Sequence, residues 1–97
     1  DQESAEFRRG NLFEYNYWTA LAFVRTSDAA AMPYRSPREV PGAGYEDWDW
    51  NCRTIAAGWL HKVVPGTAHF IRRRGPSMSA GFAAGHALVR PSEYFAD

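Results

Sequence analysis

The chain of 97 residues has little cysteine and no excess of either charge. Its single cysteine, Cys52, excludes an internal disulfide, and its place on an apolar row predicts a buried, inert thiol. This cysteine usage is compatible with a reducing cytoplasm. Eleven basic and eleven acidic side chains cancel, so no overall field attracts polyanions. We therefore expect no nucleic-acid partner.

Long apolar runs and targeting signals are also missing. No stretch approaches the ~20 apolar residues needed to cross a bilayer, and no signal-peptide pattern opens the sequence. We therefore expect a soluble, cytoplasmic protein. The length suffices for one small domain with a thin core, and an aromatic content of 15% predicts that rings fill much of that core.

Common phosphate and metal signatures are absent as well. The sequence has no glycine-rich loop between a strand and a helix, no paired-cysteine motif and no isolated Asp-x-Asp at a strand end. We therefore assign no metal ligand within this chain.

The clearest element that is present is a helix over residues 46–58. Three acids occupy its first turn, where the helix dipole is positive, and a glycine ends it. Between them runs an apolar row at helical spacing, made of Trp48, Cys52, Ile55, Ala56 and Trp59.

The three acids at the start of this helix have two interpretations. In the first, Glu46, Asp47 and Asp49 satisfy the first free amides of the helix, and Asp49 also forms a surface ion pair with Arg53, four residues on.

In the second interpretation, Asp47 is a general base. It is fixed at a rigid helix end beside Tyr45 and Trp50, and it takes a proton from a bound hydroxyl. Aromatic rings beside a carboxylate are also a common way to hold a sugar, because rings contact its apolar face and acids accept from its hydroxyls.

The remaining elements follow from periodicity and from helix and strand breakers. Residues 1–10 form a polar lead-in that we expect to be loosely ordered, and the aromatic run 12–18 follows it, with Leu12 and Phe13 expected in the core. The other predicted elements are an internal strand at 19–25, a helix capped by Ser27-Asp28 and ending at Met32, a loop at 33–44, strands at 59–64 and 67–72 around a Pro65-Gly66 turn, and a closing helix at 79–89.

Five short segments, taken in order and spacing, resemble the second half of bacterial, inverting, GT-A-fold glycosyltransferases of family 2. They are ALAFVR at 20–25, GYEDWD at 44–49, AGW at 57–59, VVP at 63–65 and IRRRGPSMS at 71–79. The likeness spans residues 16–79. It favours the interpretation of Asp47 as a base over the capping one.

The resemblance implies an α/β fold, namely the C-terminal half of a GT-A (Rossmann-like, nucleotide-diphospho-sugar transferase) fold. Residues 1–97 then form one domain that is a C-terminal fragment of a larger enzyme. Within it, 1–10 is the lead-in, 11–79 the acceptor-side region and 80–97 the C-terminal helix and tail.

The implied activity is inverting transfer of a sugar from a nucleotide-diphosphate sugar to a hydroxyl acceptor, either a saccharide or a lipid-linked saccharide. Asp47 is the implied general base, and Glu46 supports it or positions the acceptor. The implied acceptor-binding residues are Tyr45, Trp48, Trp50 and Tyr17. We expect the fragment to be inactive alone.

The basic run 72–74 has an ordinary interpretation as a solvated strand end. The resemblance instead implies that Arg72, Arg74 and Ser77 bind the departing diphosphate, since arginine forks bind phosphate oxygens in pairs. A divalent metal, Mn or Mg, is implied for the full-length enzyme, with ligands mostly outside this chain. Association of the full-length protein with a membrane is compatible with the same resemblance.

Two other classes of function stay open at this point. One is a non-catalytic carbohydrate-binding module with Tyr45, Trp48 and Trp50 as a stacking platform. The other is a protein-interaction domain with exposed aromatic residues as its interface. Self-association through an exposed sheet edge is expected for half a fold, so a homo-oligomer alone does not separate these alternatives.

Overall fold

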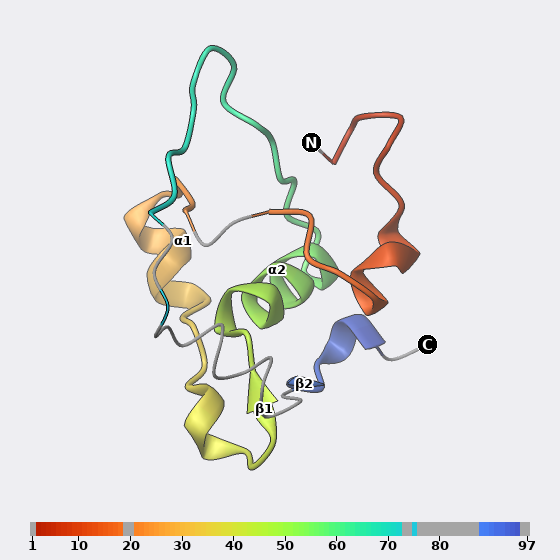
Figure 1. Ribbon diagram of the computed structural model, residues 1–97, viewed down its shortest axis with the longest axis vertical. Helices are drawn as coiled ribbons and strands as arrows, with labels where there is room; N and C mark the ends of the chain where they lie inside the picture. The colour runs from red at the N-terminus through yellow and green to blue at the C-terminus, as the bar shows by residue number, and fades with distance from the viewer. Residues whose placement is uncertain (1, 19–20, 73–74, 76–87, 96–97) are drawn as a thin grey trace.

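The computed structural model describes residues 2–18, 21–72, 75 and 88–95, and Figure 1 shows these segments gathered around one central helix. The elements in chain order are η1 (Arg9–Phe13), α1 (Thr26–Ala31), η2 (Pro37–Glu39), β1 (Ala43–Gly44), α2 (Glu46–Ala56), β2 (Leu88–Val89) and η3 (Glu93–Phe95). In these segments the architecture is mixed α/β, with two α-helices and a two-stranded parallel sheet. This confirms the coarse fold class.

Helix α2 is the predicted helix and ends two residues earlier than expected. Its backbone leaves the helix at Ala57, whose amide donates to the Arg53 carbonyl, and Gly58 follows with φ of 88°, a conformation that favours glycine. At the other end Tyr45 is the N-cap residue in the left-handed region, with φ of 56°. Its side chain makes no capping bond, so the acids of the first turn are the groups that complement the dipole.

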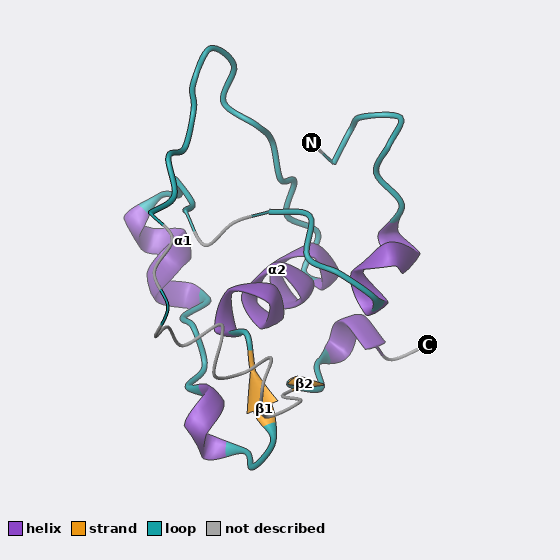
Figure 2. Cartoon of the chain, viewed as in Figure 1, coloured by secondary structure: helices purple, strands orange, loops and turns teal. Residues whose placement is uncertain are grey.

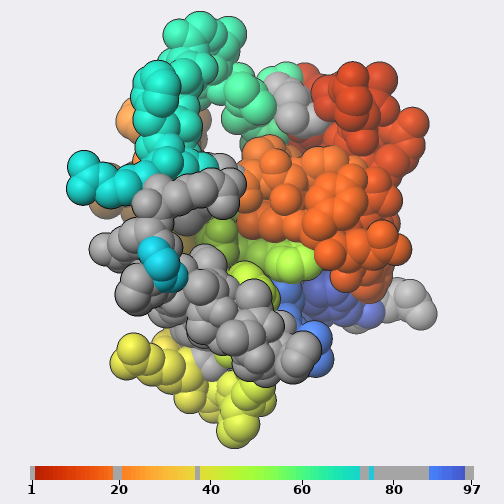
Figure 3. All heavy atoms as spheres, viewed as in Figure 1, coloured from red at the N-terminus to blue at the C-terminus, as the bar shows by residue number. Residues whose placement is uncertain are grey.

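The core forms where η1 and η3 pack against α2. The buried side chains of this cluster are Leu12, Cys52, Ile55 and Tyr94, and the rings of Phe7, Tyr17, Trp18, Trp48 and Phe95 pack around them. Figure 3 shows the N-terminal segment lying over α2. Cys52 is buried as predicted, and its burial and the nearby Asp49 charge raise the pKa of its thiol to about 12.

Two predictions for the N-terminal region are wrong. Residues 2–8 are not a loose lead-in, because the Gln2 amide donates to the His61 carbonyl at 2.9 Å and the Phe7 ring contacts Tyr17 at 4.9 Å between centroids. Phe13 is exposed instead of buried, although its ring contacts Tyr94 and Phe95. Leu12 is buried as predicted.

The two strands are short and come from distant parts of the chain. β1 and β2 run parallel, with Ala43 opposite Leu88 and Gly44 opposite Val89. Figure 2 shows this pair beside the start of α2. The predicted helix at 79–89 is wrong at its last two residues, which form β2; residues 79–87 lie outside the described residues.

The three predicted strands at 19–25, 59–64 and 67–72 are wrong wherever they are described. Residues 21–25 and 59–72 are irregular, and Phe23 is 100% and Phe70 92% exposed. A strand has no hydrogen bonds of its own and needs a neighbour, and within the described segments neither of these stretches pairs with one. The Pro65-Gly66 turn between the last two is present, with Gly66 at φ of 71°.

The short helix before the loop is confirmed, but its capping is not. α1 begins two residues earlier than predicted, after an N-cap at Arg25 instead of Ser27, and no side chain caps it. It ends at Ala31, one residue earlier than predicted, with Met32 as its C-cap residue ahead of Pro33. The predicted loop at 33–44 also contains η2 and β1. Neither of the helices described is long and apolar enough to cross a membrane.

Candidate functional site

The acids in the first turn of α2 have different surroundings. Asp49 is only 2% exposed and lies between two guanidinium groups. Arg35 donates to both of its oxygens, from Nε at 3.1 Å to Oδ2 and from Nη2 to Oδ1, and Arg53 Nε donates to Oδ2 at 3.0 Å. The predicted pair of Asp49 with Arg53 is therefore present, but Asp49 is buried and not at the surface.

Asp47 has a different environment two residues earlier. Its side chain is partly exposed, and within the described segments it accepts a single hydrogen bond, a long one of 3.4 Å from Asn16 Nδ2. Asn16 is itself held by Asn51, whose Nδ2 donates to Asn16 Oδ1 at 2.8 Å. Glu46 is also partly exposed and forms no ion pair with the residues that are described. Asp47 and Glu46 therefore have more carboxylate oxygens available to a ligand than Asp49 has.

Tyr34 lies between these acids and a hollow beside α2. Burial raises the pKa of its hydroxyl first, and the negative charges of Asp47 and Glu46 raise it further, so the phenol lies within electrostatic reach of both carboxylates. Its ring lies 5.5 Å from the Trp50 ring between centroids.

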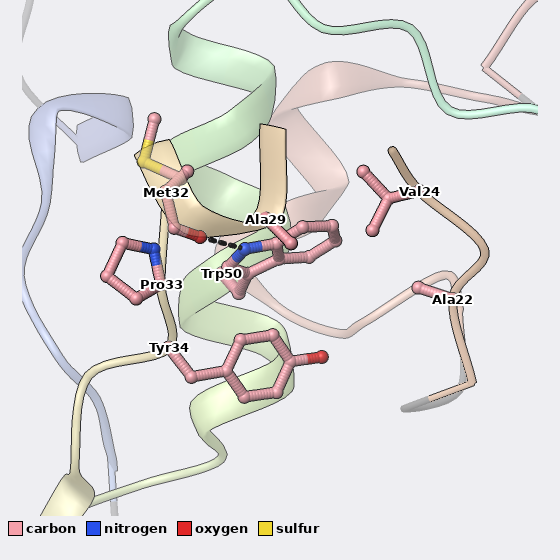
Figure 4. A pocket seen from close by; sticks show the side chains of 7 residues that line it. All are labelled: Ala22, Val24, Ala29, Met32, Pro33, Tyr34 and Trp50. Atoms are coloured by element: carbon pink, nitrogen blue, oxygen red, sulfur yellow. Dashed lines mark hydrogen bonds between the residues drawn. The ribbon is translucent and has the colours of Figure 1, made fainter. Parts of the chain in front are cut away.

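The hollow is a pocket of about 260 Å³ between α1, the segment after it and Trp50. In Figure 4 the Trp50 ring lies in the middle of the view, with Tyr34 below it and Val24 and Ala22 to its right. Its lining residues are Ala22, Val24, Ala29, Met32, Pro33, Tyr34 and Trp50. The Trp50 Nε1–H donates to the Met32 carbonyl at 2.7 Å, so the Tyr34 hydroxyl is the polar side-chain group that this pocket presents to a ligand.

The structure does not bring the four predicted acceptor-binding rings together. Trp50 is 6% exposed and lines the pocket, whereas Trp48 turns to the opposite side of α2 and donates from Nε1 to the Leu12 carbonyl at 3.0 Å. Tyr45 contacts Trp48, with 5.9 Å between ring centroids. A platform of Tyr45, Trp48 and Trp50 on one surface is therefore not formed, because two residues along a helix turn the side chain by about 200°.

Tyr17 is tied into the N-terminal packing. Its hydroxyl accepts from the Arg8 amide and from Asn11 Nδ2, both at 2.9 Å. Its ring packs against the core. Tyr17 therefore helps to shape this region and is not a lining residue of the pocket.

The predicted diphosphate-binding residues can be placed only in part. Arg72 is exposed at the end of the irregular segment 59–72, and Arg74 and Ser77 lie outside the described residues. The described residues contain no group of three or more histidine, cysteine, aspartate or glutamate side chains suited to a metal ion.

Sequence reasoning missed a partly buried histidine, His61, beside the core. His61 Nε2 lies 2.8 Å from the Thr54 hydroxyl, and its ring lies 4.5 Å from Trp18 between centroids. Burial lowers its pKa, which favours the neutral imidazole. Residue spacing carried no signal for it, and the same holds for Asn16, Tyr34 and Arg35, since all four act through contacts between distant segments.

Comparison with known proteins returned no relative. No protein-family model matches the sequence, and no curated protein or solved structure matches it significantly.

Proposed function

We propose that this chain is the acceptor-binding part of an inverting, GT-A-fold glycosyltransferase, with Asp47 as its general base. The observation that carries the proposal is the contrast between two acids on one helix turn. Asp49 is buried between two arginines, while Asp47 is partly exposed and has one weak partner, Asn16. The resemblance of 44–49 to the family is the second support.

The proposed chemistry uses one carboxylate on this chain. An acceptor hydroxyl attacks the anomeric carbon of the nucleotide sugar, its proton passes to an Asp47 oxygen, and the bond from the anomeric carbon to the diphosphate oxygen breaks. The nucleotide diphosphate leaves with the electron pair of that bond. Asn16 orients the Asp47 carboxylate through its side-chain amide. Glu46 supports Asp47 or positions the acceptor by holding a second hydroxyl.

The acceptor would enter beside Trp50 and Tyr34. A sugar ring presents an apolar face, which suits the Trp50 side of the pocket, and the Tyr34 hydroxyl can hydrogen-bond to it. Tyr45 and Trp48 contact each other and Tyr17 packs against the core, and these three rings are proposed to shape the approach to the site.

The donor side of the reaction is proposed to involve Arg72, Arg74 and Ser77 together with a divalent metal, Mn or Mg, held mostly by residues outside this chain. The exposed apolar stretches 21–25 and 59–72 support a larger protein. They have the pattern of internal strands without a sheet, as expected if their neighbours belong to the nucleotide-binding half.

Calorimetric titration of the full-length protein tests this proposal. The protein would be titrated with a panel of nucleoside diphosphates in the presence of manganese, as wild type and with Arg72→Ala and Arg74→Ala. Micromolar binding of one nucleotide, weakened by both changes, is the expected result. If no nucleotide binds, the glycosyltransferase assignment is wrong.

A second candidate is a protein-interaction module, and one observation favours it. Large apolar side chains are exposed along a single segment, namely Leu60, Val63, Val64, Phe70 and Ile71. The nucleotide titration separates the two candidates, because an interaction module binds no nucleoside diphosphate.

A further inference from the structure

A second pocket lies on the other side of the chain that leaves α1. It encloses about 250 Å³ and is lined by Met32, Arg35, Arg53, Ala57, Ser92 and Glu93. The end of α1, the second half of α2 and the start of η3 meet there. Of the residues that line the proposed acceptor pocket, it shares only Met32, so it is a separate site.

The two arginines of this pocket carry more positive charge than their shared partner Asp49 neutralises. Arg35 and Arg53 both pair with Asp49, so two guanidinium groups face one carboxylate. Glu39, the next acid that acts on Arg35, is paired with Arg90 at 2.9 Å. The arginine pair therefore keeps one positive charge that no described acid neutralises by direct contact.

Hydrogen-bond donors remain on the same arginines. Arg35 uses Nε and Nη2 on Asp49, and Nη2 also donates to the Pro91 carbonyl at 3.0 Å. No described group accepts from its third nitrogen, Nη1. Arg53 is more fully used, since its Nη2 donates to the Pro33 carbonyl at 2.7 Å and its Nη1 to Met32 Sδ at 3.4 Å. These hydrogen bonds fix both guanidinium groups, and the Nη1 edge of Arg35 keeps N–H donors for a ligand.

Ser92 adds a second, independent observation. Its Oγ is buried, and within the described segments no protein group hydrogen-bonds to it. Buried hydroxyls normally have a partner, because leaving one unpaired costs the free energy of its desolvation. Ser92 also lines the same pocket as the arginines.

We propose that this pocket binds a small oxyanion, a phosphate or carboxylate group, between Arg35 and Ser92. Guanidinium edges and hydroxyls are the usual donors to such oxygens, and the surplus charge favours an anion. Arg53 supplies charge and fixes Asp49, and so holds Arg35 in position. Glu93, which is exposed and also lines the pocket, carries a negative charge that opposes the anion. This inference does not depend on the proposed transferase activity.

The test is a titration of the 97-residue chain followed by nuclear magnetic resonance, with separate inorganic phosphate and acetate arms at constant ionic strength. The signals to follow are the Arg35 and Arg53 Nε–H groups and the Ser92 amide. We expect saturable shifts of these signals in at least one arm, and the arm that saturates first identifies the preferred oxyanion.

Three variants make the titration specific. Ser92→Ala should weaken binding about tenfold, the effect of one hydrogen bond to a charged group, without loss of folding because the removed hydroxyl has no protein partner. Glu93→Gln should strengthen binding. Ser27→Ala, which changes an exposed serine of α1, should leave binding unchanged.

Two results would overturn the inference. One is shifts that do not saturate in either arm, which indicate general screening of surface charge. The other is saturable binding to which Ser92→Ala makes no difference, because the anion then sits elsewhere and the serine hydroxyl is satisfied by water alone.

Discussion

Helix α2 and the segment 59–72 both carry regularly spaced apolar side chains, but only α2 buries them. Ile55 is 5% exposed in the helix, whereas Ile71 is 61% exposed in the segment, which Figure 1 shows as a long arch leading away from α2. A helix satisfies its backbone internally, so its apolar row needs only a packing partner. A strand needs a neighbour for its backbone as well. Of these two regions, only the one whose backbone hydrogen bonds are local forms regular structure.

The largest predicted effect comes from the buried ion pairs of α2. Asp49→Asn removes the carboxylate between Arg35 and Arg53, which leaves two partly buried guanidiniums without their partner. We expect a loss of about 3–5 kcal/mol in the free energy of unfolding, measured by urea denaturation. Asp28→Asn, an acid in the first turn of α1, is the matched control and should change stability little. Equal effects of the two changes would contradict a structural role for Asp49.

A matched isoleucine pair measures the contrast between the two regions directly. Ile55→Ala removes a core side chain and should cost about 2–5 kcal/mol. Ile71→Ala should stay within about 0.5 kcal/mol in the isolated chain, because its side chain is already in solvent. A cost at Ile71 close to that at Ile55 would show that segment 59–72 is packed.

The smallest predicted effect is a pH dependence at the junction of the two regions. His61 faces Thr54, Trp18 and Trp50, and burial lowers its pKa below the ordinary 6.5. The folded chain then binds fewer protons at His61 than the unfolded chain does, so stability falls as the pH drops below 6.5 toward the lowered pKa and is retained above it.

Thermal unfolding of His61→Gln and wild type between pH 5 and 8 checks this dependence. The variant should lose the part of the acid sensitivity that His61 contributes. His69→Gln, at an exposed position in segment 59–72, keeps His61 and serves as the control. If the fall in unfolding temperature at acid pH is the same in His61→Gln and wild type, His61 is not its source.

The sequence predicts the parts of the molecule that depend on near neighbours. The helix at Glu46–Ala56, its glycine-marked end, the buried Cys52 and the pair of Asp49 with Arg53 all follow from spacings of a few residues. Alternation and the Pro65-Gly66 turn predict the strands at 59–64 and 67–72. They are absent because alternation says nothing about whether a partner strand is available.

Of the candidate site, only the acids in the first turn of α2 could be predicted from the sequence. Asn16, which holds Asp47, is 31 residues away in sequence, and Arg35 lies 14 residues from Asp49. The sequence also placed Trp48 and Trp50 on one ligand surface, although the helix turns them to opposite sides. Such contacts depend on how loops return to α2, and no local pattern encodes that path.

The central claim is that Asp47 is a base rather than a helix cap, and one comparison tests it most directly. Sugar transfer by the full-length protein should be measured for wild type, Asp47→Asn and the control Asp28→Asn, with thermal unfolding recorded for each. If Asp47 is the base, Asp47→Asn loses about 100-fold to 10,000-fold in transfer, with an unchanged unfolding temperature and with the control at the wild-type rate. Undiminished transfer by Asp47→Asn would contradict this role.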